Sequence, residues 1–236
     1  MRLSLVRRGM RRAGGQSLNR AAILTTLNII FRRPGLLVPH VSVPHLGDLD
    51  FLSLKASGVE YVVLDKDNTL TAPYDDDAPP HPLVAAAAQS AVDIFGAEKV
   101  VVLSNSAGSA DDAGFAAAEA CEAALGLKVV RHPAEKKPRC LPELLAALGA
   151  DDASRVAVVG DRVTTDVLFA NLHGALSVHT APLTTEGDNR VAAACRAAEN
   201  AVLLPALRRL GARPPRHDAL ADLVHTQAGV VRNPRW

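Results

Sequence analysis

The sequence predicts a three-layer α/β fold, in which a central parallel sheet of about five strands is covered by helices on both faces. Short apolar runs rich in valine alternate along the chain with longer alanine-rich segments of helical character. Such alternation favours right-handed crossovers between parallel strands, which place helices on both sides of one sheet. With 236 residues, of which 48% are hydrophobic and 22% charged, the chain has the composition of one α/β domain with tails.

The expected elements follow one another in strand–helix order. The predicted strands are residues 61–64, 99–103, 127–130, 155–159 and 176–178. The predicted helices are residues 82–95, 111–125, 138–148 and 164–171, and a final helix is expected within 191–210. The connections that hold the first two helices have room for one helix each. No large cap domain is therefore expected over the sheet.

Three parts are predicted along the chain: a basic transit or membrane-association segment at 1–47, a catalytic domain at 48–185, and a C-terminal helix with a basic tail at 186–236. Eight arginines and no acidic residue precede Asp48, which is typical of a mitochondrial or plastid transit signal. Residues 18–31 are predicted to form an amphipathic helix, too short to span a bilayer, that lies in an anionic membrane interface. The alternative is a cleaved presequence with no later role.

Two carboxylates stand two residues apart directly after the first predicted strand. Asp65 and Asp67 follow the apolar run 62–64 and begin a D-x-D-x-T pattern. If this run is a central strand, Asp65 lies at its carboxyl end, where ligands bind in parallel α/β sheets. The arrangement is typical of an aspartate nucleophile and its acid/base partner in phosphate transfer. The alternative is a pair of ordinary turn or helix-cap residues.

Further polar groups stand at the ends of later strands or at the start of a helix. Lys136 and Lys137 precede Pro138 at a predicted helix start, which is an unfavourable end for cations, so one of them is expected to have another role. Asp166 is interpreted either as a metal ligand or as a supporting group, and the serine and asparagine of this set either as phosphate ligands or as helix caps. The groups are Ser104, Asn105, Lys136, Lys137, Asp161 and Asp166.

The order of these motifs resembles the haloacid dehalogenase superfamily of phosphatases, and their detailed sequences resemble the mitochondrial phosphatidylglycerophosphate phosphatases and their bacterial relatives. The similarity runs from about residue 27 to about residue 180. The segment 132–137 is one residue longer than the family spacing, which leaves open whether Lys136 or Lys137 is the family's lysine. The matching strings are VLDKDN at 63–68, SNSAGS at 104–109, RH at 131–132, KKP at 136–138 and GDRVTTD at 160–166.

The resemblance implies a haloacid-dehalogenase-like Rossmannoid fold and a role for each motif. Asp65 would be the catalytic nucleophile, and Asp67 the catalytic acid and base. A Mg²⁺ ion would be held by Asp65, the backbone carbonyl of Asp67 and the side chain of Asp161, because an all-oxygen set suits a hard cation. The residues implied to bind the substrate phosphate are Ser104, Asn105 and Lys137.

The activity implied by the resemblance is Mg²⁺-dependent hydrolysis of phosphatidylglycerophosphate to phosphatidylglycerol and phosphate through an aspartyl-phosphate. The implied location is the matrix side of the inner mitochondrial membrane, with a plastid as the alternative. The expected partners are the phospholipid substrate and an anionic membrane, with which the protein associates peripherally. Two other functions stay open: a soluble phosphatase for a small-molecule or nucleic-acid phosphate monoester, and a catalytically silent scaffold.

Composition argues against two classes of partner or site. The net charge is +1 and only 3% of the residues are aromatic, so the chain has no broad basic field or stacking platform for nucleic acid. The three cysteines, Cys121, Cys140 and Cys195, are scattered and odd in number, which indicates reduced thiols in a compartment such as a matrix or stroma. No cluster with zinc-ligand spacing is present.

Overall fold

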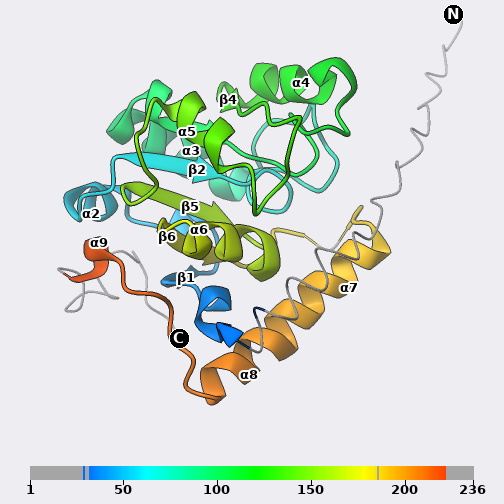
Figure 1. Cartoon of the computed structure of the whole chain (residues 1–236). Helices are drawn as coiled ribbons and strands as arrows, with labels where there is room; N and C mark the ends of the chain where they lie inside the picture. Colours follow the sequence, from blue (N-terminus) through cyan, green and yellow to red (C-terminus); the bar gives the residue numbers. More distant parts are fainter. Residues whose placement is uncertain (1–28, 30–31, 185, 222–236) are drawn as a thin grey trace, which may run out of the picture.

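The computed structural model describes residues 29, 32–184 and 186–221, which form a parallel sheet with helices on both faces (Figure 1). The sheet has six strands in the order β1-β6-β5-β2-β3-β4, and each neighbouring pair is parallel. The predicted α/β class is confirmed, with six strands where about five were expected. The strands are β1 Val41–Val43, β2 Tyr61–Leu64, β3 Val100–Val102, β4 Lys128–Val129, β5 Val156–Gly160 and β6 Leu176–Thr180.

The additional strand is β1, which pairs with β6 at one edge of the sheet and sets Val41 opposite Val178. It lies within residues 1–47, so the sheet begins before the predicted domain boundary at residue 48. Three residues between His40 and Pro44 are too few to display an alternating pattern. The strand is stabilised by a partner that lies far along the chain, and a local sequence window does not contain that partner.

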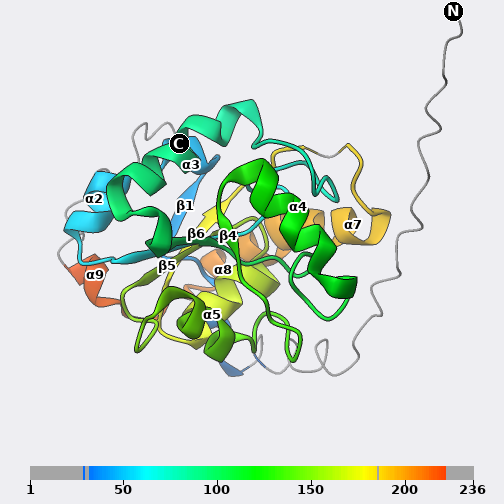
Figure 2. The ribbon, with the colours of Figure 1, turned by 90° about the horizontal axis from the view of Figure 1, so that it is seen from above.

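Successive residues of the strands face two different helical layers, because side chains alternate along a strand. Val62 and Leu64 of β2 belong to the apolar cluster on one face, whereas Val63 belongs to the cluster on the other. Figure 2 shows α2, α3 and α4 along one side of the sheet and α5 on the opposite side. The first layer consists of α2 Phe51–Ala56, α3 Pro82–Phe95 and α4 Ala116–Leu125, and the second of α5 Leu141–Leu148 and α6 Leu168–Leu172.

The predicted helices are found with small changes at their N-termini. The helix at 82–95 is reproduced without change as α3, but α4 begins at Ala116 where residue 111 was expected. The carboxylate of Asp112 accepts hydrogen bonds from the backbone N–H groups of Ala117 and Ala118, each at 2.9 Å, and so serves the first turn of α4. A carboxylate at this end of a helix pairs with N–H groups that have no partner within the helix.

The strand order creates a switch point between β2 and β5. From β2 the chain runs outward through β3 to β4, and it then crosses back to β5 on the other side of β2. Ligands bind in parallel α/β sheets at the carboxyl ends of the strands beside such a reversal. Within the described chain, the connections from β2 to α3 and from β3 to α4 are loops with one short 3-10 helix, so no large cap domain is inserted there.

The C-terminal segment forms the helix expected within 191–210. It consists of α7 (Arg190–Ala198), a π-helical turn (Glu199–Leu203) and α8 (Leu204–Arg209). A short helix, α9 (Asp218–Ala221), follows. In the part of the chain that the structure describes, none of the helices combines the length and the apolar character needed to cross a bilayer. The amphipathic helix predicted at 18–31 lies outside the described residues, apart from Ile29.

Candidate active site

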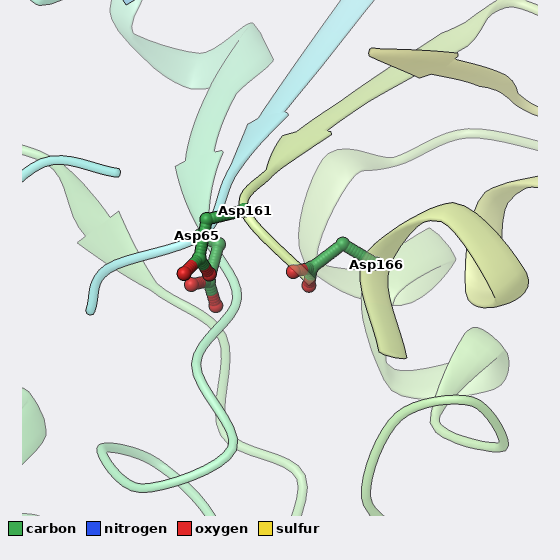
Figure 3. A group of neighbouring side chains, drawn as sticks. All are labelled: Asp65, Asp161 and Asp166. Carbon is green, nitrogen blue, oxygen red and sulfur yellow. The ribbon is translucent and has the colours of Figure 1, made fainter. Parts of the chain in front are cut away.

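Three buried aspartates converge at the carboxyl ends of β2 and β5 (Figure 3). Asp65 directly follows β2, Asp161 directly follows β5, and Asp166 lies in the π-helical turn Val163–Val167. One carboxylate oxygen from each residue lies within 4.8 Å of the others. The structure therefore brings Asp65 and Asp161 together as the sequence predicts, and it places Asp166, the candidate metal ligand or supporting group, in the same cluster.

The side chain of Asp166 can lie close to the end of β5 because residue 160 there is a glycine. A Cβ atom built on Gly160 would lie 2.3 Å from the carboxyl carbon of Asp166. No real contact is this short, so a larger residue at 160 would displace the Asp166 side chain or the strand. The backbone N–H of Asp65 donates to the carbonyl of Val159 at 2.8 Å, which continues the β2–β5 pairing up to the cluster.

Lys137 is the cation at the centre of this cluster. Its Nζ lies 2.6 Å from Oδ1 of Asp65 and 2.5 Å from Oδ1 of Asp166, and it also donates to the carbonyl of Leu103 at 2.9 Å. Lys136 instead pairs with Asp111 at 2.5 Å and keeps about a third of its side chain exposed. The motif spacing was compatible with either lysine, and the geometry shows that Lys137 is the one that contacts the aspartates.

The cluster concentrates negative charge in a buried space. Burial and the neighbouring Asp166 raise the pKa of Asp65 to about 7, although Lys137 acts in the opposite direction. Burial and Asp65 also raise the pKa of Asp161 well above its usual range, against the effect of Arg196. Burial disfavours the charge on Lys137, but Asp166 and Asp65 outweigh it and raise the pKa of this lysine. Additional positive charge would stabilise the ionised carboxylates.

One buried carboxylate oxygen of the cluster has no hydrogen-bond partner in the part of the chain that the structure describes. Oδ2 of Asp161 accepts a hydrogen bond from Nε of Arg196 at 2.5 Å. Oδ1 of Asp161 is buried and has no hydrogen-bond partner among the described residues. A buried acceptor without a partner is unfavourable, and an oxygen-binding cation at this point would satisfy it. The donor set and the unpartnered oxygen together fit a hard divalent ion.

The side chain of Asp67 is held beside this cluster and is not one of the three converging carboxylates. Its Oδ1 lies 2.8 Å from Nζ of Lys66 and accepts a hydrogen bond from the backbone N–H of Tyr74 at 2.9 Å. Its Oδ2 accepts a hydrogen bond from Oγ of Ser106 at 3.0 Å. Lys66 is fully buried and also lies 2.8 Å from Asp76, a contact that the sequence did not suggest. A role of the Asp67 backbone carbonyl as a metal ligand stays a prediction.

Ser104 and Asn105 follow β3 and do not cap α4, whose first turn is served by Asp112. Oγ of Ser104 lies 2.9 Å from Oγ of Ser106 and accepts a hydrogen bond from the backbone N–H of Ser106 at 3.1 Å. Oδ1 of Asn105 accepts a hydrogen bond from the backbone N–H of Lys137 at 3.1 Å. Asn105 therefore connects the loop after β3 to the loop that presents the lysine.

His132 is a buried residue whose contacts support the same loop. Its Nε2 lies 2.7 Å from the carbonyl oxygen of Ser104, and its Nδ1 lies 2.8 Å from the carbonyl oxygen of Glu135. The ring therefore joins the loop after β3 to the segment that leads to Lys137. In the sequence, His132 is recognisable only as part of a family motif, and that motif predicts none of these contacts.

The largest departure from the sequence analysis is the contribution of the C-terminal segment. Arg196 of α7 binds Asp161 and also pairs with Asp188. Glu199, in the following turn, accepts hydrogen bonds from the backbone N–H of Val163 at 2.8 Å and from Oγ1 of Thr164 at 2.6 Å. It also accepts from the guanidinium of Arg162, whose NH2 lies 2.8 Å away. The only signal in the sequence is an arginine and a glutamate three residues apart within an alanine-rich helix.

We expect Glu199→Gln to lower both stability and turnover, because an amide cannot accept all the hydrogen bonds that this buried carboxylate accepts. The expected loss in the free energy of unfolding is about 2–3 kcal/mol, the size of lost hydrogen bonds to a charged group. Turnover should fall because the loop 161–166 carries two of the three clustered aspartates. Chemical denaturation and steady-state kinetics would measure the two effects. Glu186→Gln, at an exposed position before α7, is the matched control, and equal behaviour of the two variants would contradict the assignment.

The comparison with known families decides which family this is. The family model of the mitochondrial PGP phosphatases, where PGP is phosphatidylglycerophosphate, matches residues 21–183. The chain belongs to this family. The match includes β1 to β6 and every predicted site residue, whereas α7 and α8 lie beyond its end.

Curated relatives of this family member come from algae, plants and fungi. Phosphatidylglycerophosphate phosphatase 1, chloroplastic, of Chlamydomonas reinhardtii is 36% identical over 219 residues, which is 90% of this chain and 79% of the relative. The chloroplastic/mitochondrial protein of that name from Arabidopsis thaliana is 34% identical over 91% of this chain, and the match spans 60% of the relative. The mitochondrial phosphatidylglycerophosphatase of Saccharomyces cerevisiae is 35% identical over 68% of this chain and 86% of its own length. No solved structure matches the chain.

Proposed function

We propose that this protein is a phosphatase that hydrolyses phosphatidylglycerophosphate to phosphatidylglycerol and inorganic phosphate in a mitochondrion, or alternatively in a plastid. Membership of the PGP phosphatase family and the names of its curated relatives support the substrate and the location. The observation that carries the chemistry is the buried cluster of Asp65, Asp161 and Asp166 around Nζ of Lys137. Such a cluster can hold a phosphate and a cation together.

The proposed reaction has two steps and begins at Asp65. A carboxylate oxygen of Asp65 attacks phosphorus, the bond from phosphorus to the substrate oxygen breaks, and an aspartyl-phosphate forms. Asp67 donates a proton to the departing alkoxide, which leaves as the glycerol hydroxyl of phosphatidylglycerol. Asp67 then removes a proton from a water molecule that attacks the same phosphorus, and this attack releases phosphate and regenerates Asp65. The hydrogen bonds of Asp67 to Ser106 and to the N–H of Tyr74 hold it in place for both proton transfers.

The attack of a carboxylate on a phosphate brings two negative groups together, which costs about 4 kcal/mol per pair of charges at 4 Å and an effective dielectric of 20. Lys137 offsets part of this repulsion, because its buried ammonium already contacts Asp65. The hydroxyl of Ser104 and the backbone N–H groups around Asn105 are proposed to bind the phosphoryl oxygens as charge spreads over them.

A Mg²⁺ ion is the proposed cofactor. Asp65, Asp161 and the backbone carbonyl of Asp67 would hold it, and Asp166 lies close enough to the same cluster to act as a ligand or to orient one. The support is the all-oxygen donor set together with the unpartnered Oδ1 of Asp161. When bound, the ion would supply positive charge to the phosphoryl oxygens.

A panel of phosphate esters tests the proposed function. The purified chain should hydrolyse phosphatidylglycerophosphate with a kcat/KM about tenfold or more above that for water-soluble monoesters, and EDTA should stop turnover until Mg²⁺ is restored. The readout is released phosphate in mixed micelles. A preference for soluble esters would favour the soluble phosphatase, and turnover that persists in EDTA would exclude the metal. Absence of turnover on every ester would favour the silent scaffold.

Peripheral membrane association is proposed from the substrate class and from the basic N-terminal sequence. We expect the full chain to sediment with vesicles that contain an anionic phospholipid and to be released as salt is raised, since surface attraction is screened within about 10 Å at 0.1 M. Vesicles of a zwitterionic lipid alone are the control. No binding to anionic vesicles, together with full activity on soluble esters, would contradict this part of the proposal.

A further inference from the structure

A cavity of about 560 Å³ lies between the edge of the sheet and the C-terminal helices. The ends of β1 and β6 form one wall, and α7, the π-helical turn and α8 form the other, which crosses beside β1 in Figure 1. Most of the lining is apolar, with alanines at 193, 197 and 201 on the helical side. Small side chains four residues apart lie on one face of a helix and leave space in front of it. The volume is in the range of sites that bind small molecules.

The cavity adjoins the aspartate cluster through two shared residues. Arg196 lines the cavity and binds Asp161 through Nε. His179 also lines the cavity, and its Nε2 lies 3.1 Å from the carbonyl oxygen of Asp161. Both side chains therefore line the cavity and contact Asp161. A ligand with its phosphate at Asp65 and its remaining part in the cavity would contact these two side chains.

Two residues that line the cavity, Asp188 and Asn200, each have a buried side-chain oxygen without a partner among the described residues. Asp188 has 2% of its side chain exposed, and its Oδ2 is paired with Arg196, but its Oδ1 accepts no hydrogen bond in the described part of the chain. Oδ1 of Asn200, in the π-helical turn, is the second such oxygen among the described residues. Buried acceptors of this kind require a donor, so they favour a ligand that carries hydroxyl groups.

A cation also lines the cavity. Arg208 of α8 is exposed and donates a hydrogen bond to Oγ of Ser42 at 2.9 Å. Apolar walls, unpartnered acceptors and a guanidinium together match a ligand with three parts, which are an apolar tail, a hydroxyl and an anionic group. A phosphatidyl group joined through glycerol to the reacting phosphate has all three.

We propose that this cavity binds the non-reacting part of the lipid substrate. In this site Arg208 binds the phosphodiester, Asp188 accepts a hydrogen bond from the single free hydroxyl of the head-group glycerol, and the alanine face of α7 and the π-helical turn contacts the beginning of the acyl-glycerol. The inference rests on the proposed function and deepens it. It also assigns a role to α7 and α8, which lie outside the residues matched by the family model.

A substitution that fills the cavity should impair hydrolysis of the lipid more than hydrolysis of a small ester. Ala201→Trp should lower kcat/KM for phosphatidylglycerophosphate in mixed micelles about tenfold or more beyond its effect on p-nitrophenyl phosphate, since hydrophobic pockets discriminate by such factors. The loss should appear mainly in KM. Val202→Trp, at the next position and 66% exposed, is the matched control and should change neither reaction. Circular dichroism monitors the fold, and Ala201→Leu replaces the tryptophan variant if that variant does not fold.

A second pair of variants tests the cation. Arg208→Gln should raise KM for the lipid, whereas Arg209→Gln, also exposed but absent from the lining, should not. The inference would be overturned if the variants at Ala201 lost as much kcat/KM on p-nitrophenyl phosphate as on the lipid. It would also be overturned if Arg208→Gln and Arg209→Gln changed KM for the lipid equally. Neither result would contradict the proposed function. Absence of turnover by the parent protein on every ester would overturn the proposed function, and the inference with it.

Discussion

Asp65→Asn should abolish turnover while the protein stays folded. An amide oxygen does not attack phosphorus and binds a divalent cation weakly, so kcat should fall by at least about 10³, in line with the losses of up to about 10⁶ seen when covalent catalysts lose the nucleophile. The thermal midpoint should change by less than about 4 °C, equivalent to about 1 kcal/mol for a chain of this size. The small stability effect is expected because Lys137 keeps its contacts with Asp166 and with the carbonyl of Leu103.

The measurement combines steady-state kinetics with a thermal melt of the same sample. Asp75→Asn is the matched control, because Asp75 lies ten residues further along the same loop region and is exposed. The control should retain parent activity. Activity of the Asp65 variant near the parent level would refute the assignment of the nucleophile. Loss of the cooperative thermal transition would show that the carboxylate is needed for folding.

Lys137→Met should lower both stability and turnover. The substitution leaves three buried carboxylates without their central cation, and removal of one partner from a buried ion pair costs about 3–5 kcal/mol. Turnover should fall about 10²-fold to 10³-fold, as when a group that stabilises the charge of a transition state is removed. Lys136→Met removes only a partly exposed pair and should cost less than about 1 kcal/mol.

The loss of stability in Lys137→Met should depend on pH. Asp65 has a pKa of about 7 in the presence of Lys137, and removal of the cation would raise this pKa further. The carboxylate can then take up a proton at low pH, which relieves the repulsion. The variant should therefore be less destabilised relative to the parent at about pH 5 than at about pH 8. Denaturation curves at the two pH values would measure this, and a pH-independent difference, or an equal effect of Lys136→Met, would contradict the role of Lys137.

Much of the fold follows from local signals. The strand at 61–64 and the helix at 82–95 are found as predicted, because apolar β-branched runs and alanine-rich segments with helical spacing are each recognisable within a short window. The polar groups at strand ends predict the site for the same reason, because each group directly follows a recognisable apolar run. Asp65 and Asp161 converge because parallel neighbours end at the same edge of the sheet, which the strand pattern already implies.

The α/β class, the strand-end aspartates and the family can all be predicted from the amino acids, since these depend on periodicity and on motifs whose residues are close together in the chain. Only the folded protein shows that Lys137 and not Lys136 reaches the aspartates, that Val41–Val43 adds a sixth strand, and that Arg196 and Glu199 support the loop after β5. Each of these depends on contacts between segments far apart in sequence. Such contacts form only when the chain is folded, and their energies leave no periodic pattern in the residues that make them.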